Sequence, residues 1–260
     1  MSDFSLESDE LTFYREHGYL VRRDVFSTEE VERLRRSVET AVRKAFDQTR
    51  DGQTYILDGK RFVDIGHMTV QFEHSPGSET IRVIEPVQHL HPELDDLVAD
   101  KRIVSPVRSI LGGHISIWTN KLNLKRGREG SGFGWHQDSP YWIHNCDHVD
   151  RLPNVYLAFD DATEANGCLK VIDRSHHRGC LPGTADGSQL GGFFTDPKCF
   201  SEEDAVSLAL TAGSIALFDA HTIHGSSPNH TDEARRAIVM TYQPANFPML
   251  KTGVIRNINL

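Results

Sequence analysis

The second half of the chain is a succession of short β-type segments separated by glycine, asparagine and aspartate, and this pattern limits the fold more than any other feature. Strands at such close spacing, with turn residues between them, are typical of antiparallel sandwiches and barrels. We therefore predict a mainly β fold with flanking helices, of the double-stranded β-helix type (jelly roll, cupin-like). The clearest segments cover residues 114–124, 154–160, 167–172, 213–219 and 236–242.

Helical signals come before these strands. Ser27 and Glu30 have the spacing of a capping box. Apolar residues then recur every three or four positions, which predicts an amphipathic helix over about 28–46 that packs against a sheet. A further helix is expected over about 102–111, and a double glycine ends it. Residues 50–90 give only brief apolar pieces between Gly, Asp and Pro, and they indicate short strands and loops.

The predicted organisation is one domain over residues 1–260. It has an N-terminal helical region to about residue 112 and a jelly-roll core over about 113–245. The segment 181–204 is rich in Gly and Pro, and loops of this length are commonly lids over a site.

Composition narrows the possible partners. The net charge of −9 disfavours nucleic acid and anionic membranes as partners, because both repel an acidic chain. No apolar run is long enough to span a membrane, and the acidic first ten residues do not resemble a signal peptide. The four cysteines form no CxxC motif, which fits reduced thiols in a cytoplasmic protein. We expect a cytoplasmic protein, and the sequence does not indicate its oligomeric state.

The most informative short motif is His136-Gln137-Asp138. If this stretch is extended, successive side chains alternate faces, so His136 and Asp138 point to one side and Gln137 to the other. An imidazole and a carboxylate on one side of a strand can bind the same metal ion. They would supply two of the three ligands in the two-His-one-carboxylate triad of non-haem Fe(II) oxygenases.

Taken alone, this spacing occurs at the frequency expected by chance. The chain has two further His-x-Asp pairs, and both lie in polar turn-like sequence. The pair at 136 differs because it follows a predicted strand and lies between Trp135 and Trp142. These tryptophans fit a core position as well as a pocket wall. The three His-x-Asp pairs are His136/Asp138, His148/Asp150 and His230/Asp232.

The chain offers a third ligand and an anchor for a cosubstrate. His224 follows the predicted strand 213–219, and Arg235 comes eleven residues later, at the start of another strand. A guanidinium can hold a carboxylate through two parallel hydrogen bonds, and Arg236 is an alternative for this role. A metal with open coordination positions and a buried arginine together suit a chelating 2-oxo acid.

The sequence resembles the phytanoyl-CoA dioxygenase (PhyH) family of Fe(II)- and 2-oxoglutarate-dependent oxygenases over roughly residues 10–245. The resemblance implies that His136, Asp138 and His224 bind iron, and that Arg235, assisted by Ser226, binds the distal carboxylate of 2-oxoglutarate. The matching pieces are Gly18–Val21, Trp135–Asp138, Glu164 with Asn166–Leu169, Ser175-His176, and His224–Ser226 with Asn229 and Arg235.

Further residues are weaker candidates. Positions similar to Phe133 and Trp142 line the cosubstrate or substrate pocket in related hydroxylases, and Trp135 is a third pocket candidate. Polar contacts with the cosubstrate are expected from the preceding strand. The candidates there are Asn120, Lys121 and Asn123.

The implied reaction uses O₂ and 2-oxoglutarate to hydroxylate a C–H bond of a small-molecule metabolite, with succinate and CO₂ as coproducts. Asp138 favours hydroxylation, because halogenating members of the family replace this carboxylate with a small residue. Two other functions stay open at this point: a non-catalytic jelly-roll protein that binds a metal or small molecule, and a zinc hydrolase. A separate zinc site at His144, Cys146 and His148 is a further hypothesis.

Overall fold

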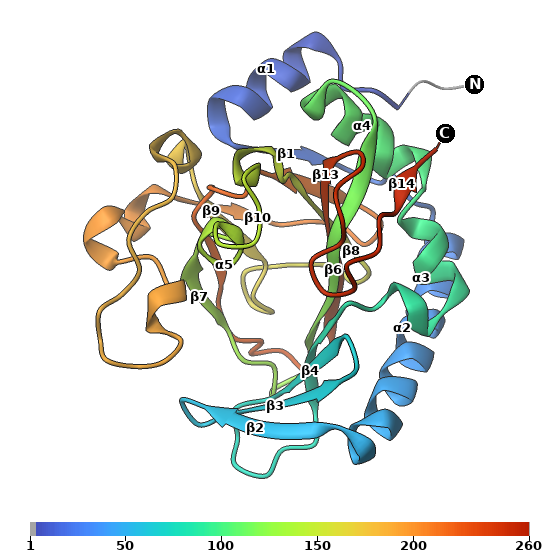
Figure 1. The fold of residues 1–260 in the computed structure, drawn as a ribbon, viewed down its shortest axis with the longest axis vertical. Helices are drawn as coiled ribbons and strands as arrows, with labels where there is room; N and C mark the ends of the chain where they lie inside the picture. Colours follow the sequence, from blue (N-terminus) through green and yellow to red (C-terminus); the bar gives the residue numbers. More distant parts are fainter. Residues whose placement is uncertain (1–3, 260) are drawn as a thin grey trace.

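The computed structural model describes residues 4–259, and its centre is a large antiparallel sheet packed against a smaller one (Figure 1). In spatial order the large sheet contains β1 (Tyr19–Arg22), β11 (Ile215–Phe218), β8 (Asn154–Ala158), β13 (Arg235–Pro244), β6 (Ile115–Lys125), β5 (Ile81–Glu85), β4 (Met68–Phe72), β3 (Lys60–Ile65) and β2 (Gln53–Leu57), with β14 (Asn257–Ile258) paired to β6. The small sheet contains β10 (Ala205–Leu208), β9 (Leu169–Ile172), β12 (His224–Ser226) and β7 (Phe133–His136). This confirms the predicted jelly-roll fold with flanking helices.

Helices cover the outer face of the large sheet, as Figure 1 shows for α2 and α3. The longest, α2, begins at the predicted capping box: Ser27 Oγ accepts from the Glu30 amide, and the Glu30 carboxylate accepts from the Ser27 amide. Its apolar stripe, which includes Val38, is buried in one core with the sheet. The helices are α1 (Ser8–His17), α2 (Thr28–Gln48), α3 (Pro92–Leu97), α4 (Lys101–Leu111) and the short α5 (Ser139–Trp142).

Side-chain alternation in the large sheet separates two cores. On β13, Ile238 and Met240 join the core beneath the helices, whereas Ala237 and Val239 face the small sheet. Because alternate residues share a face, Arg235 points with Ala237 and Val239 into the space between the sheets. The fold therefore brings polar side chains of the large sheet toward the strands that carry the predicted metal ligands.

The description of residues 1–112 as a helical region was wrong in part. This region does contain helices α1 to α4, but it also contains β1 to β5, all of which belong to the large sheet. Strand β4 was missed, although Met68, Val70 and Phe72 alternate with Thr69 and Gln71 as expected for a strand. The predicted turn near residues 164–167 joins β8 of the large sheet to β9 of the small one.

Two other expectations concern loops and the membrane. Residues 181–204 form a long connection whose only regular elements are short 3₁₀ turns, the first at Gly191–Phe193, as the composition predicted. Within residues 4–259, no helix has the length and apolar character needed to cross a membrane. The four cysteines are all free.

Candidate active site

His136, Asp138 and His224 meet between the two sheets. All three side chains are buried, and one potential ligand atom from each lies within 4.8 Å of the others. His136 ends β7, His224 begins β12, and the two residues are direct partners in the antiparallel pairing of these strands. The pairing accounts for the close approach of the two imidazoles, whose ring centroids are 4.1 Å apart.

The structure corrects how Asp138 reaches this cluster. The extended strand ends at His136, and Asp138 has helical backbone angles (φ −77°, ψ −28°) immediately before α5. Its amide donates to the carbonyl of Ala220 at 3.0 Å, which fixes the turn. Gln137 does point away from the cluster, as predicted: its Nε2 donates to the carbonyls of His221 at 2.6 Å and Gly179 at 2.8 Å. A turn, and not strand alternation alone, therefore places the carboxylate beside the imidazoles.

Both imidazoles are held in the form that binds metals. Nδ1 of His136 lies 2.7 Å from the carbonyl of Gly134, and Nδ1 of His224 lies 2.9 Å from that of Thr222. A carbonyl can only accept, so each Nδ1 carries the hydrogen and each Nε2 has a free lone pair. Burial lowers the pKa of His136 to about 3 and also lowers that of His224, so both rings stay neutral and able to coordinate a metal.

Asp138 is kept ionised and oriented. Its Oδ1 lies 3.3 Å from the ammonium of Lys121, and its Oδ2 accepts from Asn154 Nδ2 at 2.9 Å. Burial alone would raise the pKa of Asp138, but the ammonium of Lys121 favours the ionised carboxylate, and the pKa lies below its usual value. Two neutral imidazoles and one carboxylate in a buried site are the donor set that suits Fe(II).

The other potential metal sites do not form. The carboxylate of Asp150 binds Nε2 of His221 at 2.7 Å, and that of Asp232 pairs with Arg128. The zinc hypothesis for residues 144–148 was wrong, because His148 Nε2 contacts Gln243 Oε1 at 3.0 Å and joins no cluster. Across residues 4–259, the group around His136 is the only cluster of potential metal ligands.

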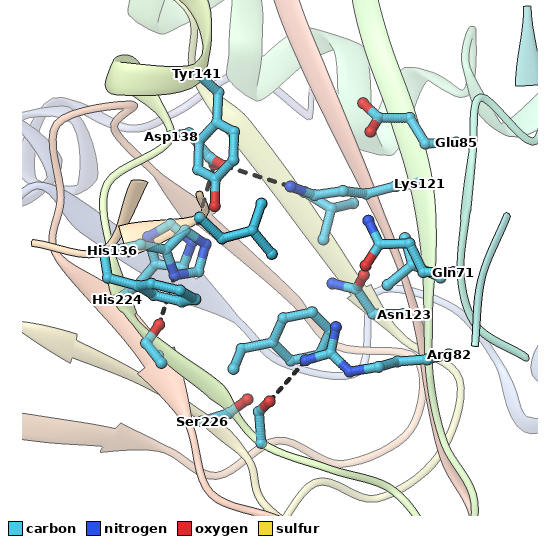
Figure 2. A pocket seen from close by; sticks show the side chains of 18 of the residues that line it. Gln71, Arg82, Glu85, Lys121, Asn123, His136, Asp138, Tyr141, His224 and Ser226 are labelled. Carbon is cyan, nitrogen blue, oxygen red and sulfur yellow. Dashed lines mark hydrogen bonds and ion pairs between the residues drawn. The ribbon is translucent and has the colours of Figure 1, made fainter. Parts of the chain in front are cut away.

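The three residues open into a cavity of about 570 Å³. Figure 2 shows the three predicted metal ligands on one wall and a polar wall from β4, β5 and β6 opposite them. A cavity of this size is in the usual range for small-molecule sites. The labelled residues of the polar wall are Gln71, Arg82, Glu85, Lys121 and Asn123.

One end of the cavity is suited to an anion. Arg235 is 2% exposed; its Nη1 donates to the hydroxyl of Tyr156 at 2.6 Å, and its Nε has no partner. Among the described residues, no carboxylate oxygen lies within 4.0 Å of this guanidinium. A buried and unpaired guanidinium is costly, so the site favours a carboxylate ligand. Arg236, the alternative, points outward and pairs with Asp160 and Glu39.

The remaining predicted residues divide into two groups. Ser226, Phe133, Trp142, Lys121 and Asn123 line the cavity. Asn120 and Trp135 do not, so their predicted contacts are not supported. The Oδ1 atom of Asn120 accepts from the amides of Val87 and Gln88, on the other side of β6. The ring of Trp135 packs on Phe200, with centroids 5.6 Å apart.

Several site residues were missed from the sequence. Arg82 lies over the ring of Phe133, with Cζ 3.7 Å from the centroid, and Lys125 lies opposite Arg235 in the β6–β13 register. Arg82 could have been found, because it is a lone charge inside the apolar segment 81–84. Asn154 and Tyr156 give no comparable signal, since polar and aromatic residues are common within strands.

Comparison with known proteins agrees with this geometry. Residues 14–237 match the family described as Phytanoyl-CoA dioxygenase (PhyH). An ectoine dioxygenase from Bordetella parapertussis is 28% identical over 256 residues, covering 92% of this chain and 75% of that protein. An L-proline trans-4-hydroxylase from Streptomyces griseoviridis is 28% identical over 183 residues, covering 64% and 68%. EctD from S. alaskensis, solved with 2-oxoglutarate and 5-hydroxyectoine, superposes with a TM-score of 0.73 at 23% identity, covering 98% and 82%; this likeness shows the fold.

The His-Asp-His cluster, the family match and the two curated relatives together define an Fe(II)- and 2-oxoglutarate-dependent oxygenase. The chain belongs to the phytanoyl-CoA dioxygenase (PhyH) family, whose match covers most of its length. This membership decides against the zinc hydrolase and the non-catalytic binding protein, the two alternatives that the sequence left open.

Proposed function

We propose that His136, Asp138 and His224 bind Fe(II), and that Arg235 and Ser226 bind the distal carboxylate of 2-oxoglutarate. The observation that carries this proposal is that Arg235, buried without a carboxylate partner among the described residues, lines the same cavity as the three metal ligands. When bound, the iron supplies O₂ activation coupled to the decarboxylation of 2-oxoglutarate to succinate and CO₂. The protein orients the reactants and excludes water.

Aromatic residues of α5 and of the 181–204 loop are the groups that would exclude water from the cavity. The ring of Tyr141 stacks on Phe193 of the 181–204 loop, with centroids 4.3 Å apart. Phe194 of the same loop lines the cavity, and the ammonium of Lys60 lies 5.2 Å from its ring centroid. These contacts hold the 181–204 loop beside the cavity, where it would help to shield bound reactants from solvent.

We infer that the substrate is a small metabolite carrying both a positive and a negative group, and that the reaction is hydroxylation of one of its C–H bonds. Glu85 and Lys251 both line the cavity. Thr69 on β4 is the strand-pairing partner of Glu85 on β5, and its Oγ1 accepts from Lys251 Nζ at 3.1 Å. Glu85 and Lys251 are therefore both neighbours of Thr69. An amino-acid-like zwitterion complements this arrangement. The names of the two curated relatives, which refer to ectoine and L-proline, agree with a small substrate.

A substrate screen tests this proposal. Purified enzyme with Fe(II), ascorbate and 2-oxoglutarate is incubated with matched pairs of compounds, each zwitterion beside its analogue without the nitrogen. Succinate formation is measured against the slow turnover without substrate. We expect stimulation only by zwitterions, and loss of the preference in Glu85→Gln. Equal stimulation by the nitrogen-free acids contradicts the substrate class, and absence of succinate under every condition contradicts the oxygenase assignment.

A further inference from the structure

Lys125 is a fully buried lysine next to Arg235 and Ser226, which line the end of the cavity that suits an anion. It ends β6 directly opposite Arg235 on β13, and none of its surface reaches solvent. Its ammonium nitrogen contacts three oxygen atoms: the carbonyl of Gly167 at 3.3 Å, the carbonyl of Ser227, and Oγ of Ser226 at 2.8 Å. All three are uncharged, so Lys125 has no ion-pair partner within the described part of the chain.

The turn at Gly167 is built around this nitrogen. Gly167 has φ +76°, and a Cβ there would stand 2.7 Å from Lys125 Nζ and 2.0 Å from the carbonyl oxygen of Ser227. Any side chain at this position would displace the lysine from its three oxygens. The close packing shows that the Lys125 nitrogen has a fixed place beside Ser226.

The three oxygen atoms around Lys125 Nζ differ in the hydrogen bonds that they can make. A carbonyl oxygen can only accept, so two N–H groups of Lys125 serve Gly167 and Ser227 in either charge state. A hydroxyl can both donate and accept. A neutral Lys125 therefore offers its lone pair to the hydrogen of Ser226, whereas a protonated Lys125 donates to Ser226 Oγ. In the second case the Ser226 hydrogen is free to point into the cavity that Ser226 lines.

The charges around Lys125 favour its neutral form until an anion arrives. Burial, followed by the guanidinium groups of Arg235 and Arg82, lowers the pKa of Lys125 to about 6. The carboxylate of Glu73 and the thiol of Cys168 oppose this shift but do not overcome it. A carboxylate bound to Arg235 would bring negative charge beside the amine and stabilise its protonated form.

We propose that Lys125 is a positioning residue for the cosubstrate: binding of the 2-oxoglutarate distal carboxylate at Arg235 is coupled to uptake of one solvent proton by Lys125, which turns the Ser226 hydroxyl hydrogen toward that carboxylate. No other bond forms or breaks in this step. The inference rests on the proposed role of Arg235. Its consequence is that the enzyme binds 2-oxoglutarate more tightly as the pH falls toward about 6.

Calorimetry tests the proposal on the intact enzyme. 2-Oxoglutarate is titrated anaerobically into the Fe(II)-loaded protein, in pairs of buffers with different ionisation enthalpies, between about pH 6 and pH 8. We expect uptake of nearly one proton per 2-oxoglutarate in the upper part of this range. The apparent affinity should fall by up to about tenfold per pH unit above the Lys125 pKa. Binding without proton uptake overturns the inference and leaves the proposed function intact, whereas absence of binding contradicts the function itself.

Two variants test whether Lys125 is the group that takes up the proton. Lys125→Met should weaken 2-oxoglutarate binding and abolish both the proton uptake and its pH dependence. Lys101→Met, at an exposed lysine that begins α4 and does not line the cavity, should keep both. Proton uptake that survives in Lys125→Met shows that another group takes the proton and overturns the assignment. If Lys125→Met does not fold, the wild-type titration still decides whether binding and protonation are coupled.

Discussion

The side-chain amide of Asn154 donates a 2.9 Å hydrogen bond to Oδ2 of Asp138, so a residue of the large sheet orients the carboxylate that follows β7 of the small sheet. The orientation of the amide is itself fixed, because Thr241 Oγ1 donates to Asn154 Oδ1 at 2.6 Å. This chain of contacts links the two sheets at the metal site.

Replacing Asn154 by leucine should weaken Fe(II) binding by about 10- to 100-fold, the usual cost of losing a partner that orients a metal ligand. Anaerobic metal titration measures the affinity, and thermal unfolding reports whether the fold survives. Thr241→Val is the matched control, since it removes only the contact that fixes the amide, and it should have a smaller effect. Wild-type iron affinity in folded Asn154→Leu contradicts the orienting role.

Asp58 ties the β2–β3 hairpin to the loop over the cavity. Its exposed carboxylate accepts from the amides of Gln189 at 3.0 Å and Leu190 at 2.7 Å. Asp58→Ala should leave global stability nearly unchanged but speed hydrogen exchange at these two amides, because it removes their acceptor. Asp51→Ala, at an exposed carboxylate just before the same hairpin, is the control. Unchanged exchange in Asp58→Ala would show that the loop is held by other contacts.

His74 should make folding stability depend on pH. Burial, then Arg82 and Lys60, lowers its folded-state pKa to about 4 from 6.5. Below pH 6.5 the unfolded chain binds this proton more readily, so the free energy of unfolding falls with pH down to about 4. Denaturant unfolding of the metal-free protein at several pH values measures the slope. His74→Gln should flatten it over this window, and an equal slope in the variant contradicts the assignment.

The neighbours Arg235 and Arg236 provide a matched pair of variants. Arg235→Met should cost about 2–5 kcal/mol of 2-oxoglutarate binding free energy, because it removes the buried partner of the distal carboxylate. Arg236→Met should instead lower the free energy of unfolding, since Asp160 and Glu39 lose their cation, and should leave cosubstrate affinity unchanged. Binding constants from anaerobic titration compare the two. A reversed pattern assigns the cosubstrate to Arg236.

Sequence reasoning found the parts of the site that have local signals. The spacing of His136 and Asp138, the position of His224 after a strand, and the choice of Arg235 over Arg236 follow from motif and strand order. The structure brings the three predicted metal ligands together, and Arg235 lines the same cavity.

The parts that were missed depend on long-range register. Lys125 is important because β6 pairs with β13 and places it opposite Arg235, which no local pattern reveals. The backbone turn at Asp138 also depends on a tertiary contact, with Ala220. Asn120 lies outside the cavity because its side chain bonds to Val87. Residues 50–90 were hardest to assign because strands β2 to β5 extend an existing sheet, and β4 and β5 are buried on both faces.

The most direct test of the central claim is an anaerobic titration of Fe(II) and 2-oxoglutarate into the wild-type protein and Asp138→Ala. We predict that the wild type binds one iron per chain and gains a charge-transfer absorption band when 2-oxoglutarate is added. The folded variant should lose tight iron binding and the band. An unchanged band in Asp138→Ala, or a wild type that binds zinc and shows activity with zinc alone, would contradict the assignment of this site.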